Sequence, residues 1–171
     1  LAERLAAGLR PRMVYVVPNF HNPSGATMSL ARRRHLADLA DQHDLLIVED
    51  DPYGAIRFAG EPLPPIASFT DRVVYLSTFS KIVAPGFRVG WMIGPPEVMS
   101  WVARAKQAAD LHTPGYNQRI VHAVIENGFL DAHVPTIRAR YAKHRDAMRA
   151  ALERHMPAGC RWNAPKGGMF F

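Results

Sequence analysis

The sequence predicts an α/β protein with a mostly parallel sheet flanked by helices, and three observations support this fold class. Short apolar runs rich in β-branched residues occur at residues 14–17, 45–48 and 73–76, and continuous runs of this kind are typical of strands buried on both faces. The helical pattern SLARRRHLADLADQHD separates the first two runs. A strand, a helix and a second strand in this order imply parallel pairing through a right-handed crossover.

The helical pattern between the first two runs has a clear start and one apolar side. Ser29 is a preferred N-cap residue, and Leu30, Leu36, Leu39 and Ala40 fall toward one face. We therefore expect a helix that begins after Ser29 and packs on the sheet.

The remaining elements follow from turn residues and periodicity. Residues 50–72 carry four prolines and show no clear period, which predicts a long loop. Residues 88–93 fit a further strand that ends at Gly94-Pro95-Pro96. Helices are expected at residues 97–108, at residues 117–126 with Gly128 as the stop, and at residues 130–155.

The last expected helix has an apolar stripe, which predicts a face packed on the core. After it the chain turns at Pro157 and Gly159 and ends in PKGGMFF, an apolar run that resembles a strand cut short. The stripe consists of Val134, Ile137, Tyr141, Met148 and Leu152.

Composition excludes several classes of function. A chain of 171 residues with 48% apolar content fits one ordinary domain. It has no apolar run of about eighteen residues and no signal-peptide pattern, so we expect a cytoplasmic protein without a membrane span. One cysteine, Cys160, suits a reducing compartment, and the eight histidines lack metal-ligand spacing, so no metal site is expected.

The net charge of +6 does not by itself indicate a nucleic-acid partner. The basic residues lie among acidic ones along the expected helices, which is typical of solvated helix faces. We interpret the densest basic cluster, Arg32-Arg33-Arg34, as the beginning of the polar side of a helix.

Three strand ends deliver polar side chains in turn. Val17 leads into PNFHNPSG, Val48 into EDDPYG and Leu76 into STFSK. Because ligands of open α/β sheets bind at the carboxyl ends of the strands, we expect these three segments to converge at one edge.

This set of motifs resembles the fold-type I enzymes that use pyridoxal phosphate (PLP). The resemblance is closest to the aminotransferases of the aminoadipate and multi-substrate amino-acid group. It covers nearly the whole chain, including RRRHLADLA, KQAADLHTP and GFLDAHVPTIRARYAKHRDAM. The resemblance implies an enzyme that moves an amino group between an amino acid and a 2-oxo acid through a lysine Schiff base, in a cytoplasmic homodimer.

The resemblance assigns the Schiff-base lysine and catalytic proton shuttle to Lys81 in STFSK. An aldehyde cofactor needs an amine that can lose its proton, which burial and a neighbouring cation both favour. On residue type alone, Lys81 would be a surface lysine.

The resemblance also places a carboxylate against the pyridine nitrogen, which keeps that nitrogen protonated. Asp50 and Asp51 compete for this role, and the family spacing of three residues before a tyrosine selects Asp50 with Tyr53. Tyr53 and Asn22 would bind the phenolic oxygen of the cofactor. The alternatives are a helix-cap or turn role for Asp50, simple packing for Tyr53 and an Asx-turn for Asn22. In the family the bond corresponding to Asn22-Pro23 is commonly cis.

A phosphate group requires hydroxyl donors and a bidentate cation. Thr78, Ser80 and Arg88 match the family's phosphate-binding set, with Gly86 permitting the tight loop between Lys81 and Arg88. Strand-end hydroxyls that satisfy backbone groups are the alternative for Thr78 and Ser80. Arg57 lies on the proline-rich loop, where we expect it to be exposed and a substrate-facing position is the alternative; His21, beside Asn22, has the same two alternatives.

The family's chains are more than twice as long, so we expect an internal fragment that by itself binds PLP weakly and is inactive. Its expected parts are a partial PLP-binding large domain at residues 1–128, an interdomain helix at 129–155 and the beginning of a small C-terminal domain at 156–171.

Two other functions fit the same residues. One is the aminotransferase-like sensor domain of a transcription regulator, for which a winged-helix DNA-binding domain would precede this chain. The other is a fold-type I lyase or synthase, which differs from a transaminase in the products that it releases.

Overall fold

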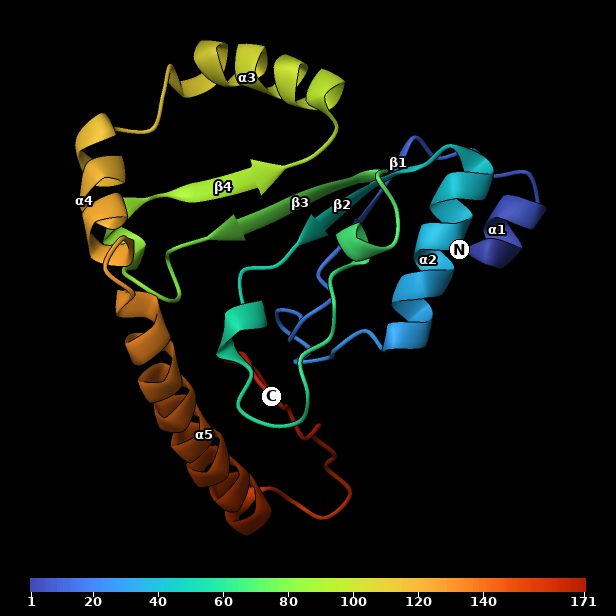
Figure 1. Ribbon diagram of the computed structural model, residues 1–171. Helices are drawn as coiled ribbons and strands as arrows, with labels where there is room; N and C mark the ends of the chain where they lie inside the picture. The colour runs from blue at the N-terminus through green and yellow to red at the C-terminus, as the bar shows by residue number, and fades with distance from the viewer.

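The computed structural model describes residues 1–171 and confirms the expected α/β class, with one sheet in the order β1-β2-β3-β4 (Figure 1). The strands are β1 (Met13–Val16), β2 (Leu46–Asp50), β3 (Val73–Thr78) and β4 (Gly90–Ile93). The first three are parallel, as the strand-helix-strand order predicted, and β4 runs antiparallel to β3.

The four longer helices agree with the sequence pattern to within a few residues at each end, whereas the short helix at Ala2–Ala6 was not predicted. Ser29 is the N-cap of α2, where its hydroxyl accepts from the Arg32 N–H, as predicted. Gly128 does not end α4; it precedes α5 in a left-handed conformation, with φ of 69°. The helices are α1 (Ala2–Ala6), α2 (Leu30–His43), α3 (Pro96–Asp110), α4 (Gly115–Ile125) and α5 (Phe129–His155), with short 3-10 turns η1 (Gly54–Ile56), η2 (Ile66–Ser68) and η3 (Pro85–Phe87).

Two of the 3-10 turns lie within the proline-rich stretch that sequence patterns assigned to an irregular loop. None of the helices combines the length and apolarity that crossing a membrane requires.

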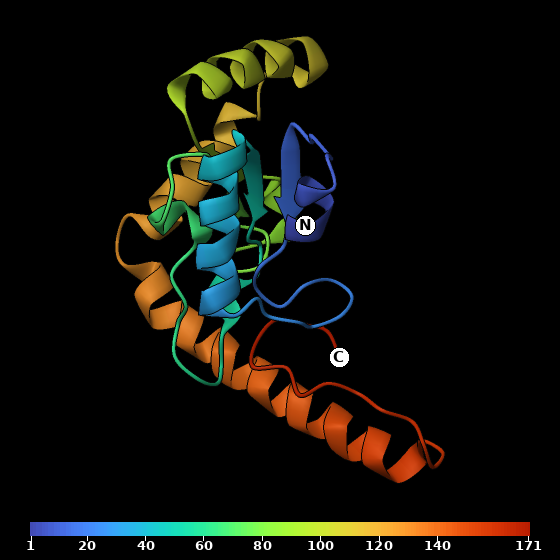
Figure 2. The ribbon, with the colours of Figure 1, turned by 90° about the vertical axis from the view of Figure 1, so that its right-hand side faces the viewer.

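The two faces of the sheet differ in cover. On the side that we call the helix face, Ile47 and Val73 pack with Leu36, Leu39 and Ala40 of α2 in the core. Figure 2 shows α2 lying along this side of the strands. Because strand side chains alternate, the neighbouring positions point to the opposite side, which we call the open face.

The open face corrects the expectation of strands buried on both sides. Its β1 residues Met13 and Tyr15 are 60% and 58% exposed, whereas Ile47 on the helix face is fully buried. A continuous apolar run therefore did not indicate burial on both faces, because this chain covers only one side of β1.

The apolar stripe of α5 is a second correction, because no residue of this helix is buried. α5 contacts the rest of the structure mainly at η1 and α4, and Figures 1 and 2 show it extending past the sheet as an arm. Met148, expected in the core, is 51% exposed.

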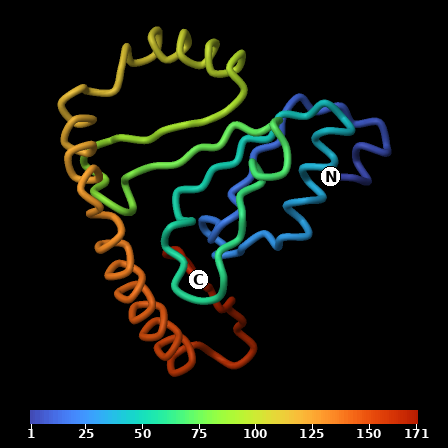
Figure 3. The backbone as a smooth tube through the Cα atoms, viewed as in Figure 1, coloured from blue at the N-terminus to red at the C-terminus, as the bar shows by residue number.

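The C-terminal PKGGMFF run forms a single antiparallel bridge, Gly167 with Arg57, rather than a strand. It nevertheless packs closely, and Figure 3 shows the C-terminal end beside the loop that follows β2. A Cβ atom on Gly167 would overlap the Phe20 ring and lie 2.5 Å from the Ile56 carbonyl oxygen.

We expect Gly167→Ala to lower the free energy of unfolding by about 1–3 kcal/mol, because overpacking of a close contact forces its neighbours apart. Urea unfolding measures the change. Gly115→Ala is the matched control, since nothing lies within 4 Å of its added Cβ. Equal stability of the two variants would contradict the close packing of the C-terminal run.

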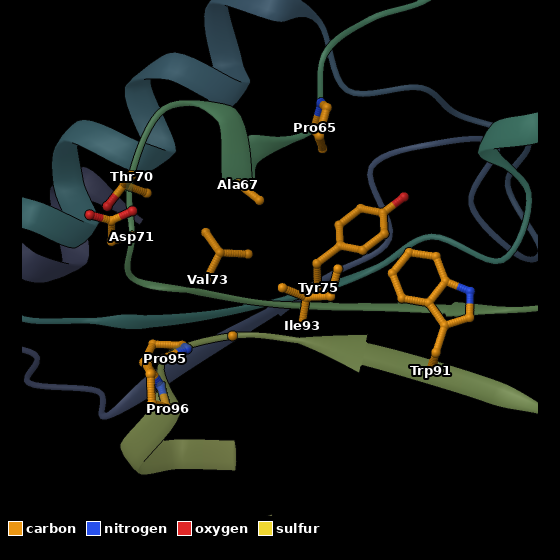
Figure 4. Close-up of a pocket in the computed structure, with 11 residues that line it drawn as sticks. Pro65, Ala67, Thr70, Asp71, Val73, Tyr75, Trp91, Ile93, Pro95 and Pro96 are labelled. Atoms are coloured by element: carbon orange, nitrogen blue, oxygen red, sulfur yellow. The ribbon is translucent and has the colours of Figure 1, made fainter.

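A groove of about 630 Å³ lies on the helix face between η2 and β4 (Figure 4). Tyr75 and Trp91 line it with their ring centroids 5.5 Å apart, and Ile93 and Pro65 contribute apolar surface. It contains none of the residues that the motifs assign to the site.

Candidate functional site

Strand alternation separates the two candidate aspartates. Asp50 follows Val48 on the open face of β2, where the Tyr15 hydroxyl donates a hydrogen bond to its Oδ2 atom at 2.5 Å. Asp51 lies on the helix side, where its Oδ2 atom accepts from the Tyr75 hydroxyl at 2.8 Å. The two adjacent carboxylates therefore face opposite sides of the sheet.

Asn22 and Tyr53 lie on the same side as Asp50. Burial raises the pKa of Tyr53, the side chain of Asn22 lowers it, and the charge of Asp50 raises it further. The Tyr53 ring is 7% exposed and packs edge-to-face on Phe170, with centroids 5.6 Å apart. The structure thus brings together three of the residues that the motifs named, and the predicted cis bond at Asn22-Pro23 is present.

The end of β3 carries the hydroxyl pair of the STFSK motif. The Thr78 hydroxyl lies 2.9 Å from the Ser80 hydroxyl and 3.1 Å from the Val89 carbonyl oxygen, and it accepts from the Ser80 N–H. These contacts agree with the alternative role of the two residues, in which strand-end hydroxyls satisfy backbone groups. They also fix the beginning of the loop that carries Lys81.

Lys81 is partly buried and makes no hydrogen bond or ion pair. With Ser80 it lines a groove of about 480 Å³ whose other side includes Arg140 and Tyr141 of α5. Its amine is therefore unengaged beside a space that could admit a ligand.

Arg88 has a left-handed backbone, with φ of 54°, and its Nη1 atom donates to the Pro85 carbonyl at 3.3 Å. The loop between Lys81 and Arg88 is also held from α4, where the Asn117 amide donates to the Phe87 carbonyl at 3.0 Å. Neither Lys81 nor Arg88 is hydrogen-bonded to Asn22, Asp50 or Tyr53.

The structure shows the contacts of Arg57 and His21, whose roles the sequence left open. Arg57 is only partly exposed, contrary to expectation, because its guanidinium lies 4.9 Å from the centroid of the Phe20 ring. His21 has its Nδ1 atom 2.9 Å from the Ser24 hydroxyl, which is a contact within the turn.

Sequence patterns did not indicate a group of buried polar side chains on the helix face of the sheet. Arg33 is fully buried, not on the polar side of its helix, and donates to the Asn19 amide oxygen at 2.6 Å. It also donates to the carbonyl oxygens of Met28, Pro64 and Pro18. Only its position three residues after Leu30, near the apolar stripe of α2, could have indicated burial.

Glu49 is also fully buried, and its two carboxylate oxygens accept from the Ile66 and Ala67 N–H groups at 2.9 and 3.1 Å. Burial raises the pKa of Glu49, and these hydrogen bonds together with the charge of Arg33 oppose the rise. Glu49 thus ties β2, the strand that carries Asp50, to η2, while Arg33 ties α2 to the segments that follow β1 and precede η2.

No group of three or more His, Cys, Asp or Glu side chains is arranged to hold a metal ion. The polar groups instead comprise an amine, a carboxylate, an amide, a phenol, two hydroxyls and a guanidinium along one edge of the sheet. This donor set suits a phosphorylated, nitrogen-containing aldehyde better than a cation.

Comparison with known proteins agrees with the fold and this arrangement. The sequence model of the family described as aminotransferase class I and II matches residues 2–171. An aromatic-amino-acid aminotransferase of Thermococcus litoralis is 47% identical over 99% of this chain and 41% of its own length. The chain therefore belongs to the class I and II aminotransferase family.

A solved structure shows the same fold. The kynurenine aminotransferase of Pyrococcus horikoshii, crystallised in complex with PMP, superposes with a TM-score of 0.93 at 45% identity, covering 98% of this chain and 42% of that one. An HTH-type transcriptional regulator of Bacillus subtilis is 33% identical over 93% of this chain and 33% of its own length. The chain thus spans well under half the length of the relatives that it matches.

Proposed function

We propose that the full-length polypeptide is a PLP-dependent aminotransferase that moves an amino group between an amino acid and a 2-oxo acid. The supporting observation is that Asn22, Asp50 and Tyr53 gather on one side of β2 while the Lys81 loop follows the next strand. Membership in the aminotransferase family supports the same conclusion.

PLP, when bound, supplies an electron sink that stabilises negative charge at the substrate α-carbon. Lys81 would carry the cofactor through its Nζ atom and, once displaced by the substrate amine, move a proton from the substrate α-carbon. Asp50 would accept a hydrogen bond from the protonated pyridine nitrogen through its free Oδ1 atom. Tyr53 and Asn22 would hold the phenolic oxygen.

Thr78, Ser80 and Arg88 would bind the phosphate. Two hydroxyls and a guanidinium match the acceptor oxygens of a phosphate in number and charge. The backbone contacts of Thr78 and Ser80 would orient both hydroxyls before the phosphate arrives.

The domain organisation is part of the proposal. Residues 1–128 would belong to the cofactor-binding domain, residues 129–155 would form the interdomain helix, and residues 156–171 would begin the small domain. The arm-like course of α5 supports a connecting role. Exposed Trp101, Leu111 and Tyr116 support a homodimer, and the single free Cys160 suits the cytoplasm.

Reduction of the PLP-loaded full-length protein with borohydride, followed by peptide mapping, tests the function. We expect one phosphopyridoxyl group, attached at Lys81. Attachment at another lysine, or no attachment, would refute the proposed role of Lys81.

The similarity to a transcriptional regulator favours a PLP-responsive sensor domain as a second candidate. Incubation of the full-length protein with amino acids and 2-oxo acids separates the candidates. We expect a new 2-oxo acid without ammonia release. Cofactor attachment with no turnover would favour the sensor, and ammonia release would favour a lyase.

A further inference from the structure

Tyr15 lies outside the three motifs, but it forms a hydrogen bond with Asp50, which belongs to one of them. Tyr15 on β1 pairs with Val48 on β2, so its side chain shares the open face with Asp50, two residues further along. Its hydroxyl donates to Asp50 Oδ2 at 2.5 Å, and Asp50 Oδ1 accepts no hydrogen bond. The phenol thus holds one oxygen of the carboxylate and leaves the other free.

The contact with Asp50 also shifts the pKa of Tyr15. The hydrogen bond to Asp50, together with burial and the charges of Asp50 and Tyr53, raises the pKa of Tyr15 to about 12. Tyr15 therefore remains a donor throughout the neutral range. A donor to one oxygen restricts rotation of the carboxylate about its terminal torsion, which is otherwise broad.

We propose that Tyr15 is a positioning residue for Asp50 and that it directs the free Oδ1 atom toward the pyridine nitrogen of the cofactor. This inference rests on the proposed function, because it requires Asp50 to be the partner of that nitrogen. Tyr15 touches neither substrate nor cofactor in this role; it acts through the carboxylate.

The chain contains a matched control on the opposite face. Tyr75 on β3 pairs with Glu49, and its hydroxyl donates to Asp51 Oδ2 at 2.8 Å, again two residues further along β2. The two tyrosines thus make the same kind of bond to adjacent aspartates, and only the Tyr15 bond lies on the side of Asn22 and Tyr53.

The test compares Tyr15→Phe and Tyr75→Phe in the full-length protein. For Tyr15→Phe we expect about a ten-fold rise in the Kd for PLP, because one hydrogen bond to a charged group is lost. We also expect a changed absorption band of the bound cofactor and a lower kcat at nearly unchanged KM. The Tm should stay near that of the wild type, since Tyr15 is 58% exposed.

For Tyr75→Phe we expect a lower Tm with an unchanged absorption band and Kd. A Tyr15→Phe protein with wild-type Kd and spectrum would overturn the inference, provided that borohydride still labels Lys81 in the wild type. Equal spectral changes in both variants would also overturn it, because the effect would not be specific to Asp50. Absence of Lys81 labelling in the wild type would instead remove the proposed function itself, and with it the role of Tyr15.

Discussion

Replacing Lys81 by alanine is expected to lower the transamination rate of the full-length protein by about 10²–10⁴-fold or more, the usual contribution of a positioned general base. The change removes both the covalent attachment of the cofactor and the amine that moves the proton. Lys81 makes no hydrogen bond or ion pair in the structure, so its loss should leave the fold intact. Stopped-flow or steady-state assays measure the rate, and thermal unfolding measures the fold.

The control for this variant is Lys106→Ala. Lys106 on α3 forms an exposed ion pair with Asp110, four residues along the helix, with Nζ 2.7 Å from Oδ2. Surface pairs of this kind contribute at most about 1 kcal/mol, so activity and stability should change little. Near-normal turnover in Lys81→Ala would reject Lys81 as the catalytic amine.

The second large effect concerns stability. We expect Arg33→Met to lower the free energy of unfolding by about 3 kcal/mol, because each buried acceptor that loses its donor costs about 1–3 kcal/mol. Methionine fills similar space but removes the donor of the Asn19 amide oxygen and of the Met28 and Pro64 carbonyl oxygens, while the Pro18 carbonyl oxygen keeps the Met28 N–H. It also removes the positive charge that opposes the raised pKa of buried Glu49.

Urea unfolding of the full-length protein measures this loss, with Arg32→Met as the control. Arg32 is the preceding residue on α2 and is exposed, so the same substitution there should change the free energy of unfolding by less than about 0.5 kcal/mol. If both variants unfolded at the same urea concentration, the buried network would not contribute as the structure indicates.

The Lys81 and Arg33 variants distinguish a loss of chemistry at the site from a loss of the packing that stabilises it. Lys81 lies on a loop after β3, where few contacts depend on its side chain. Arg33 binds Asn19 and the carbonyl oxygens of Pro18 and Pro64 on the helix side of the sheet, so its loss would disturb the buried segments that support the strands. Activity should therefore be lost without unfolding in the first case and together with stability in the second.

Several elements could be predicted from the sequence because local chemistry decides them. Ser29 caps α2 through a bond to a residue three positions away, and the three apolar runs form the parallel strands. Local patterns failed where burial depends on distant partners: Met148 of the α5 stripe is exposed and no residue of that stripe is fully buried, whereas Arg33, within a basic cluster, is fully buried. Periodicity indicates which residues share a face but not what covers that face.

The sequence alone established the family and the order of its polar motifs, since PNFHNPSG, EDDPYG and STFSK each follow an apolar run. The tertiary structure alone decided that Asp50 shares a face with Tyr15 and Tyr53, while Asp51 shares the other with Tyr75. The physical reason is the register between strands. It is set by pairing between residues 33 positions apart for β1 and β2 and 26 positions apart for β2 and β3, and it determines which side chain can reach which carboxylate.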